Sequence, residues 1–305
     1  MKIYNNILLV FLMLGLGVNA QLPSHLESNV LDGVYVQEHV PTKRVVQYTY
    51  LREADVMWSK RIWRIIDLRE KQNHQLYYPL QPISDRMALW DVIRQGVLNE
   101  GSITCYELGL DLDDQFRYPI KPANGNINDP DYKKRLMEKF GKATSFTVRD
   151  EDGLPLTDDE GNEIKKDTIE PYFAKDIIRY EIKEDWFFDK QRSVMDVRII
   201  GISPIVYFVN PESQEVEGAE NLFWLYFPEC RYMFQNYFVY NPHNDAQRMS
   251  FDDFFWKREF SSYIKKESNV YDRQVYPNWK GIDALLESEK IKEKMFDIEH
   301  DVWHF

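Results

Sequence analysis

The sequence predicts an α+β fold in which helices pack on a mainly antiparallel sheet. Between residues 177 and 240, strand-like segments follow one another with short turns, as in an antiparallel sheet. Helical spacing of apolar residues occurs on both sides of this region, near residues 52–71 and again at 282–302. A chain of 305 residues is long enough to bury a sizeable core. We therefore expect one core domain over residues 51–280.

Residues 1–20 have the pattern of a signal peptide. Lys2 gives the positive start, an apolar run covers residues 7–16, and small residues end at Ala20. The run is too short to span a membrane, and an uncleaved anchor is disfavoured because Ala20 suits cleavage so well. Gln21, not a lipid-accepting cysteine, would then begin the mature chain. We expect export of a protein that is not itself a lipoprotein and has no membrane span.

Residues 21–50 are expected to form an extended N-terminal arm. Asp32-Gly33 indicates a turn, and alternating apolar residues around Pro41 indicate two short strands or a peripheral extended segment. Such an arm can fold back on its own domain or lie across a neighbouring subunit.

The stretch from Arg52 to Pro79 is predicted to begin with a helix that has two apolar sides. Trp58 and Ile62 lie on the core side, whereas Arg61 and Arg64 are expected to reach outward. Two interpretations are open. The helix is either a core helix whose long cations extend to water, or a helix held between its own core and a partner. The candidate interface residues of this stretch are Arg61, Trp63, Arg64 and Arg69.

Further elements follow in order. Ser84 is predicted to cap a second helix that ends at Gly101, and a strand at residues 103–108 carries Cys105. A loop at 119–130 precedes a helix over 131–140. Residues 145–170 indicate a hairpin with an acidic tip. A calcium loop there is the less favoured alternative to solvated turns, because the glycine after Asp150 misses the EF-hand position.

Aromatic residues are concentrated between Asn221 and Tyr263, where 15 of 43 residues carry rings. A carbohydrate platform is one interpretation, and a core plus a protein interface is the favoured one. Within this region Ser250 and Asp253 predict a capping box that opens a helix. Trp256 is a candidate interface residue. On this helix Phe251, Phe254 and Phe255 are expected on one side, with Trp256, Phe260 and Tyr263 on the other.

The last helix is predicted over residues 282–302, within a C-terminal segment 281–305. Its apolar seam follows a heptad-like spacing and fits either the domain itself or a partner helix. Trp303 and Phe305 are expected to dock, and Trp303 is a candidate interface residue. The seam consists of Ala284, Ser288, Ile291, Met295, Ile298 and Val302.

Cys105 and Cys230 are the only cysteines, and both are expected on strands. In an oxidising compartment they would pair if those strands are neighbours, and two buried free thiols are the alternative.

Catalytic and cofactor motifs do not appear in the sequence. Only His300 and His304 have the spacing of metal ligands, without an obvious third ligand, so we expect neither a metal nor a cofactor. The net charge of −12 argues against nucleic acid as a partner. We expect no enzyme, although a glycan- or peptidoglycan-binding module and a secreted hydrolase remain alternatives.

Several blocks resemble the GldN (PorN) family of gliding motility proteins. They are residues 51–64, residues 66–71 with the following Tyr77-Tyr78-Pro79, residues 32–36 and residues 250–258. The resemblance implies a periplasmic component of the type IX secretion and gliding machinery of Bacteroidota. It further implies a ring of copies of the chain with an outer-membrane lipoprotein, GldK, and contact with GldM, which crosses the periplasm from an inner-membrane motor.

Overall fold

The computed structural model describes residues 44–83, 86–109, 114–122, 125–147, 165–209, 216–241, 244 and 246–302. All of them belong to one compact unit, Pro41–Phe305. The predicted signal peptide, most of the predicted arm, the proposed helix cap Ser84, the acidic hairpin tip, His304 and Trp303 lie outside the described residues.

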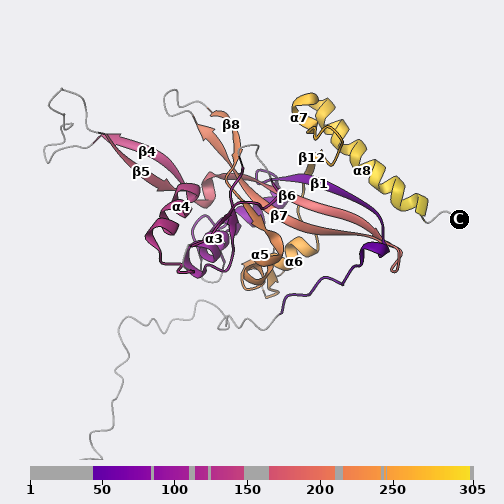
Figure 1. Cartoon of the computed structure of the whole chain (residues 1–305), viewed down its shortest axis with the longest axis horizontal. Helices are drawn as coiled ribbons and strands as arrows, with labels where there is room; N and C mark the ends of the chain where they lie inside the picture. Colours follow the sequence, from indigo (N-terminus) through magenta and orange to yellow (C-terminus); the bar gives the residue numbers. More distant parts are fainter. Residues whose placement is uncertain are drawn as a thin grey trace, which may run out of the picture. The chain divides into compact units, whose positions relative to one another are not determined.

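An eight-stranded sheet forms the centre of this unit, and the predicted α+β class is confirmed (Figure 1). Its order is β12-β1-β6-β7-β9-β2-β3, with β8 also paired to β7, and its strand pairs are antiparallel. The strands are β1 (Val56–Asp67), β2 (Cys105–Tyr106), β3 (Pro119–Ile120), β6 (Ile177–Asp189), β7 (Val194–Val209), β8 (Val216–Asn221), β9 (Trp224–Tyr226) and β12 (Tyr263–Glu267).

The predicted helix after Arg52 is wrong, because this stretch forms strand β1. It pairs with β6 on one side and β12 on the other, after a single 3-10 turn, η2 (Glu53–Asp55). Where both faces of a central strand are covered, apolar residues are needed at both odd and even positions. Ile62, Trp63, Ile65 and Ile66 meet this need, and their spacing happens to resemble that of a helix. The β-branched and aromatic residues in this run fit a pleated surface better than a helix.

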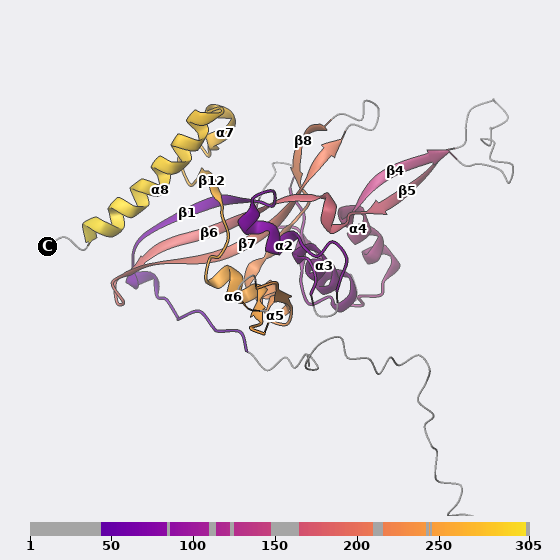
Figure 2. The same cartoon turned by 180° about the vertical axis from the view of Figure 1, so that it is seen from behind.

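Four short helices lie together along the sheet (Figure 2): α2 (His74–Tyr77), α3 (Leu89–Arg94), α5 (Phe227–Phe234) and α6 (Phe251–Trp256). The side chains of Ile66, Ile182 and Ile202 are buried there with those of α3, α5 and α6 in one hydrophobic core. Gly101, in the left-handed region at φ 63°, ends the second predicted helix where expected, although that helix starts only at Leu89. Helix α3 continues into the π-helical η4 (Gln95–Glu100), and the 3-10 turns here are η3 (Lys71–Asn73) and η5 (Ala174–Asp176).

A helix and a hairpin extend this layer. Helix α4 (Pro130–Phe140) begins at the Asp129 cap and ends where predicted, before Gly141. Strands β4 (Gly141–Thr147) and β5 (Lys165–Pro171) form the predicted hairpin as a separate two-stranded sheet. Another two-stranded sheet joins β10 (Phe238–Val239) and β11 (Met249–Ser250).

The aromatic stretch mostly builds the core. The Ser250–Asp253 capping box of α6 is confirmed, and Phe251, Phe254 and Phe255 are buried. Phe260 was expected on the other side of α6, but it packs against the rings of Phe254 and Phe255 in the same core. The core interpretation of this stretch therefore holds for most of its rings.

Helix α8 (Ile282–Val302) has the predicted bounds and docks on its own sheet, next to the short helix α7 (Val275–Asn278). Ile291 and Met295 of its seam join Ile62 and Ile264 in a second hydrophobic cluster. The Ser288 hydroxyl accepts a hydrogen bond of 2.9 Å from the Ile264 amide.

Candidate interaction site

A recess of about 1110 Å³ lies on the face of the sheet opposite the helices, and we call it the sheet groove. Side chains alternate between the two faces of a strand. The residues next to the buried Ile62 and Ile182 along β1 and β6 therefore point to the face with the groove. Arg61 and Trp63 of β1 and Glu181 and Asp185 of β6 line the groove. Residues of β7, β8, β9, β12 and the loop 114–117 also belong to its lining.

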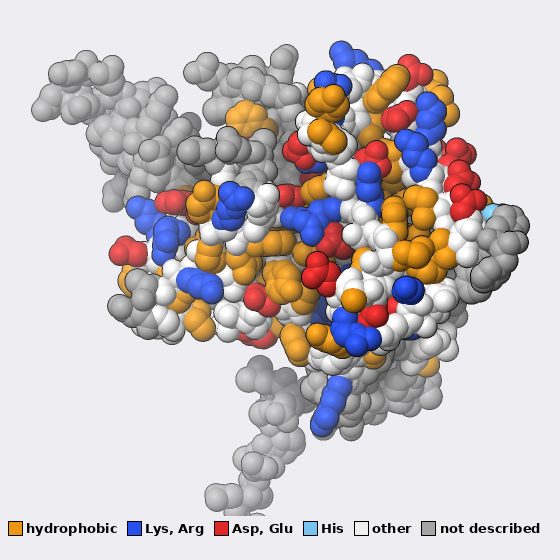
Figure 3. All heavy atoms as spheres, turned by 45° about the vertical axis from the view of Figure 1, so that its right-hand side comes forward, with side chains coloured by type: hydrophobic (Ala, Val, Ile, Leu, Met, Phe, Trp, Pro, Cys, Tyr) orange, Lys and Arg blue, Asp and Glu red, His pale blue; other side chains and the backbone are white. Residues whose placement is uncertain are grey.

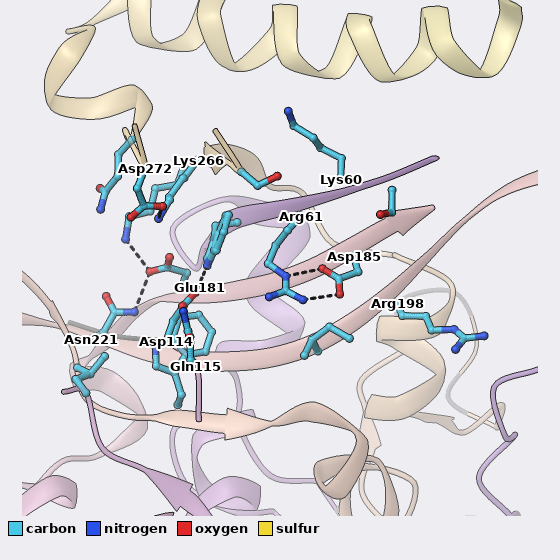
Figure 4. Close-up of a pocket in the computed structure, with 18 of the residues that line it drawn as sticks. Lys60, Arg61, Asp114, Gln115, Glu181, Asp185, Arg198, Asn221, Lys266 and Asp272 are labelled. Carbon is cyan, nitrogen blue, oxygen red and sulfur yellow. Dashed lines mark hydrogen bonds and ion pairs between the residues drawn. The ribbon is translucent and has the colours of Figure 1, made fainter. Parts of the chain in front are cut away.

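A row of charges crosses the groove from strand to strand (Figure 4). Asp185 is in register with Arg61 on β1 and with Arg198 on β7. Arg61 donates two hydrogen bonds to the Asp185 carboxylate, 2.6 and 2.7 Å long, which raises the pKa of the Arg61 guanidinium. The Arg198 guanidinium lies 5.1 Å from the rings of both Tyr48 and Phe187, and it donates to a carbonyl of the arm at Thr49.

The buried Lys183 holds the loop 114–117 at the groove. This lysine is 2% exposed, and its Nζ donates to the Asp114 carbonyl at 2.7 Å and lies 3.3 Å from the Asp114 carboxylate. Burial lowers the pKa of the Lys183 ammonium, and Asp114 opposes that effect. The Trp63 indole donates a hydrogen bond to the same carboxylate.

Gly201 allows aromatic rings of this loop and of β9 to approach the sheet. A Cβ atom at Gly201 would lie 2.7 Å from Phe116 Cζ, too close without a shift of that ring, and would make a tight contact of 3.1 Å with Trp224 Cε3. The Phe116 ring in turn lies 5.0 Å from Lys183 Nζ.

The other end of the groove is also ordered by paired charges. Glu181 accepts hydrogen bonds of 2.8 Å from Lys265 of β12 and from Asn221 of β8. Lys266 lies 4.5 Å from the centre of the Trp63 ring and pairs with Asp272. Cations and anions thus alternate along the whole groove.

This lining suits a polypeptide better than a small molecule. Ligand pockets usually have roughly 300–1,000 Å³ and mainly apolar walls with few polar groups, whereas this recess is lined by many charged side chains of both signs. Alternating charges give specificity and orientation at polar protein interfaces. Among the described residues, no group of three or more His, Cys, Asp or Glu side chains is arranged to hold a metal ion.

Arg64 does not reach outward, contrary to the expectation for an interface residue. It lies on the opposite face from Arg61 and Trp63, with its side chain 9% exposed. Its Nε is 3.2 Å from the fully buried Glu184 carboxylate, without hydrogen-bond geometry. Arg258 donates two hydrogen bonds to Glu184, and the Trp186 indole donates a third. Side chains alternate between the two faces of a strand, so positions that differ by an odd number lie on opposite faces. Arg61 and Arg64 differ by three positions in β1 and therefore point to different faces.

The other predicted interface residues lie apart. Arg61 and Trp63 share the sheet groove, whereas Arg69 is 63% exposed at the end of β1 and pairs with Asp67. Trp256 is 49% exposed and stacks on Tyr48, with ring centres 5.3 Å apart. This part of the arm therefore packs on its own domain.

Both cysteines are buried free thiols in the structure. Cys105 lies on β2, but Cys230 lies on helix α5 rather than on the expected strand, and its thiol faces the Tyr226 carbonyl at 3.4 Å. Burial raises the pKa of both thiols.

Several residues that line or support the groove were missed from the sequence, above all Asp114 and Arg198 in its lining and the buried Lys183 beneath it. For Lys183 a signal existed, since Glu181 and Lys183 alternate with the apolar residues Tyr180 and Ile182. The loop residue Asp114 and the β7 residue Arg198 gave no comparable signal. Contacts with Lys183 hold Asp114 at the groove, and the register between β6 and β7 brings Arg198 there.

Fold and groove together define an α+β protein with a charged groove on the sheet face opposite its helical core. A family model described as "Gliding motility associated protein GldN" matches residues 51–304, so the chain belongs to this family. Membership associates it with gliding motility and type IX secretion. No curated protein matches the chain. No described helix has the length and apolar character needed to cross a membrane.

Proposed function

We propose that this chain is a non-enzymatic structural subunit of the periplasmic ring of the type IX secretion and gliding machinery. The observation that carries the proposal is the family match over residues 51–304, which includes every strand and helix that builds the sheet groove. The groove adds a surface whose paired charges suit protein recognition.

The sheet groove is proposed to bind an outer-membrane lipoprotein partner, a GldK-like subunit. In this proposal the lipid anchor of that partner holds the chain at the outer membrane. A charged segment of that partner would exchange ion pairs with Arg61, Asp185 and Lys266, which are held in place by neighbouring strands. Such pre-positioned groups lose little side-chain entropy on binding.

A GldM-like periplasmic domain and further copies of this chain are the other proposed partners. The ring would receive motion from an inner-membrane motor through the GldM-like domain. In the proposed mechanism the subunit transmits force rather than catalysing a reaction. The buried ion pairs on the helical side of the sheet would keep the subunit rigid under that force.

The native mass of the purified mature chain, alone and with each candidate partner, tests this proposal. We expect a stable complex with the lipid-free lipoprotein, and its loss in Asp185→Lys, which reverses one charge in the groove. Glu107→Lys is the matched control, because its side chain is 40% exposed, against 32% for Asp185, and it lies outside the groove lining. An unchanged mass with both partners would contradict the proposal.

The glycan-binding alternative gains less support. Stacking on sugars needs exposed rings, whereas Trp63 and Phe187 in the groove are at most 7% exposed. The exposed rings of the aromatic stretch, Tyr232, Tyr240 and Trp256, lie outside the groove lining. Retention of the chain on purified peptidoglycan in a pull-down would favour this alternative.

A further inference from the structure

Helix α8 carries a second apolar surface opposite its docked seam. Ile282, Leu285 and Leu286 occupy one face of the helix at spacings of three and four residues, and they are 76%, 59% and 55% exposed. Trp279, just before the helix, is 47% exposed, and its ring lies 6.0 Å from Lys290 Nζ one turn beyond Leu286. We call these four residues the α8 ridge. Figure 3 shows the side of the molecule that carries α7 and α8, where apolar side chains are interspersed with acidic ones.

The ridge belongs to an acidic helix. Between Ile282 and Val302 the chain has seven Asp or Glu residues and three Lys residues. Asp283, Glu287 and Glu289 lie within one turn of the ridge, and Glu287 and Glu289 pair with Lys290 and Lys292 of the same helix. A partner for this surface therefore needs an apolar recess with a basic rim.

The same chain offers such a recess elsewhere. A groove of about 670 Å³ follows helix α2, and its apolar lining comes from Tyr78, Pro79, Ile83 and Tyr240. Tyr78, Ile83 and Tyr240 are 50%, 59% and 45% exposed. The charged side chains described in its lining are Lys71 and Arg86, and the Arg86 guanidinium lies 5.3 Å from the Tyr240 ring. We call this recess the α2 groove.

We propose that the α8 ridge of one copy binds the α2 groove of the next copy. Shape and charge both favour this pairing, because a convex acidic ridge meets a concave basic recess. Two ridges facing each other would bring like charges together, and two grooves would leave both recesses unfilled. The contact is therefore heterologous, and repetition of it closes into a ring or continues as a filament. This inference rests on the proposed role as a subunit of a ring, and it names the surfaces that join the copies.

Cross-linking of two single-site variants tests the contact. Leu286→Cys places a thiol on the ridge, and Ile83→Cys places one in the α2 groove, while the two native cysteines are buried and do not compete. The two variants of the mature chain, one carrying a mass tag, are mixed and mildly oxidised. The mixed dimer should form faster than either variant forms dimers alone. Val270→Cys, at a residue that is 96% exposed, replaces the ridge variant as the control.

A second measurement gives the strength of the contact. Replacing Leu285 and Leu286 by Asp should weaken self-association by roughly tenfold per leucine, since burial of one leucine is worth about that factor. The melting temperature should not change, because both side chains are exposed. Equal cross-linking of the Leu286 and Val270 variants, or dominant Leu286–Leu286 dimers, would overturn the ridge-to-groove contact.

Failure of this contact and failure of the proposed function have different signatures. The same variants are tested for binding of the lipid-free lipoprotein. Retained lipoprotein binding without specific cross-linking rejects only the ridge-to-groove contact. If the unmodified chain does not bind the lipoprotein, the proposed function is rejected, whatever the cross-linking shows.

Discussion

Arg231 of α5 and Asp252 of α6 form a buried ion pair with two hydrogen bonds of 2.7 and 3.1 Å. Their side chains are 3% and 5% exposed. The same guanidinium donates a 2.8 Å hydrogen bond to the Val46 carbonyl and lies 4.5 Å from the Tyr48 ring. One buried charge thus joins two helices and fastens the end of the N-terminal arm to them.

Removal of Arg231 is expected to destabilise the protein strongly. Arg231→Met leaves the Asp252 carboxylate buried without its cation, which should lower the free energy of unfolding by about 3–5 kcal/mol. The double variant Arg231→Met, Asp252→Leu should recover much of that loss, because no unpaired charge remains. Urea unfolding of the three proteins provides the measurement. A single variant as stable as the double one would refute the buried pair.

Arg64 and Arg61 are expected to differ although they lie three residues apart on one strand. Arg64→Ala removes one of two cations at the buried Glu184, and we expect a loss of about 2 kcal/mol, less than for a lone pair because Arg258 remains. Arg61→Ala should cost less than about 1 kcal/mol, since its side chain is 41% exposed. Thermal unfolding of both variants measures the difference. Equal losses would mean that the two faces of β1 are assigned incorrectly.

Asp67 should make stability depend on pH in the acid range. Burial alone would raise its pKa, but hydrogen bonds from Arg69 and Arg179 prevail and lower the pKa from 3.8 to about 2. A carboxyl group with a lowered pKa in the folded state stabilises the fold above its unfolded pKa, and this contribution disappears as the pH falls through the folded value.

The variant Asp67→Asn lacks this contribution at every pH. Compared with the unmodified protein, the variant should have a lower free energy of unfolding. This difference should be constant down to about pH 5 and shrink as the pH approaches about 2. Asp272→Asn, at a side chain that is 78% exposed, serves as the control. A deficit that grows on acidification would have the wrong sign for this arrangement.

The two thiols are expected to be unreactive in the folded protein. Both are buried with raised pKa values, and the thiolate is the reactive form. A thiol reagent should modify neither cysteine in the native state and both in denaturant without reductant. Intact mass gives the count, and a mass without modification after unfolding would show that Cys105 and Cys230 pair after all.

Much of the fold could be predicted because local signals agreed with it. The capping box at Ser250, the helix over 282–302 and the hairpin around residues 141–171 depend on residues close in sequence. Helix α5 was missed since its aromatic residues resembled the preceding strand, although Pro228 in its first turn was an available signal. In β1, burial on both faces removed the alternation that identifies a strand.

The sheet groove could not be predicted in the same way. Arg61, Asp185 and Arg198 are separated by long stretches of sequence and meet only through the register of three strands. A bulge between Lys183 and Glu184 shifts that register by one residue, which no sequence pattern showed. Positions of single groups in the groove therefore had to come from the structure.

Photo-cross-linking from the sheet groove in living cells tests the central claim most directly. A photoreactive phenylalanine replaces Arg117 or Asp272, which both line the groove, and replaces Met137, 46% exposed on α4, as the control. If the groove binds the lipoprotein partner, irradiation should join that lipoprotein to the chain at the two groove positions and not at Met137. Equal capture at all three positions, or no lipoprotein captured from the groove, would contradict the account.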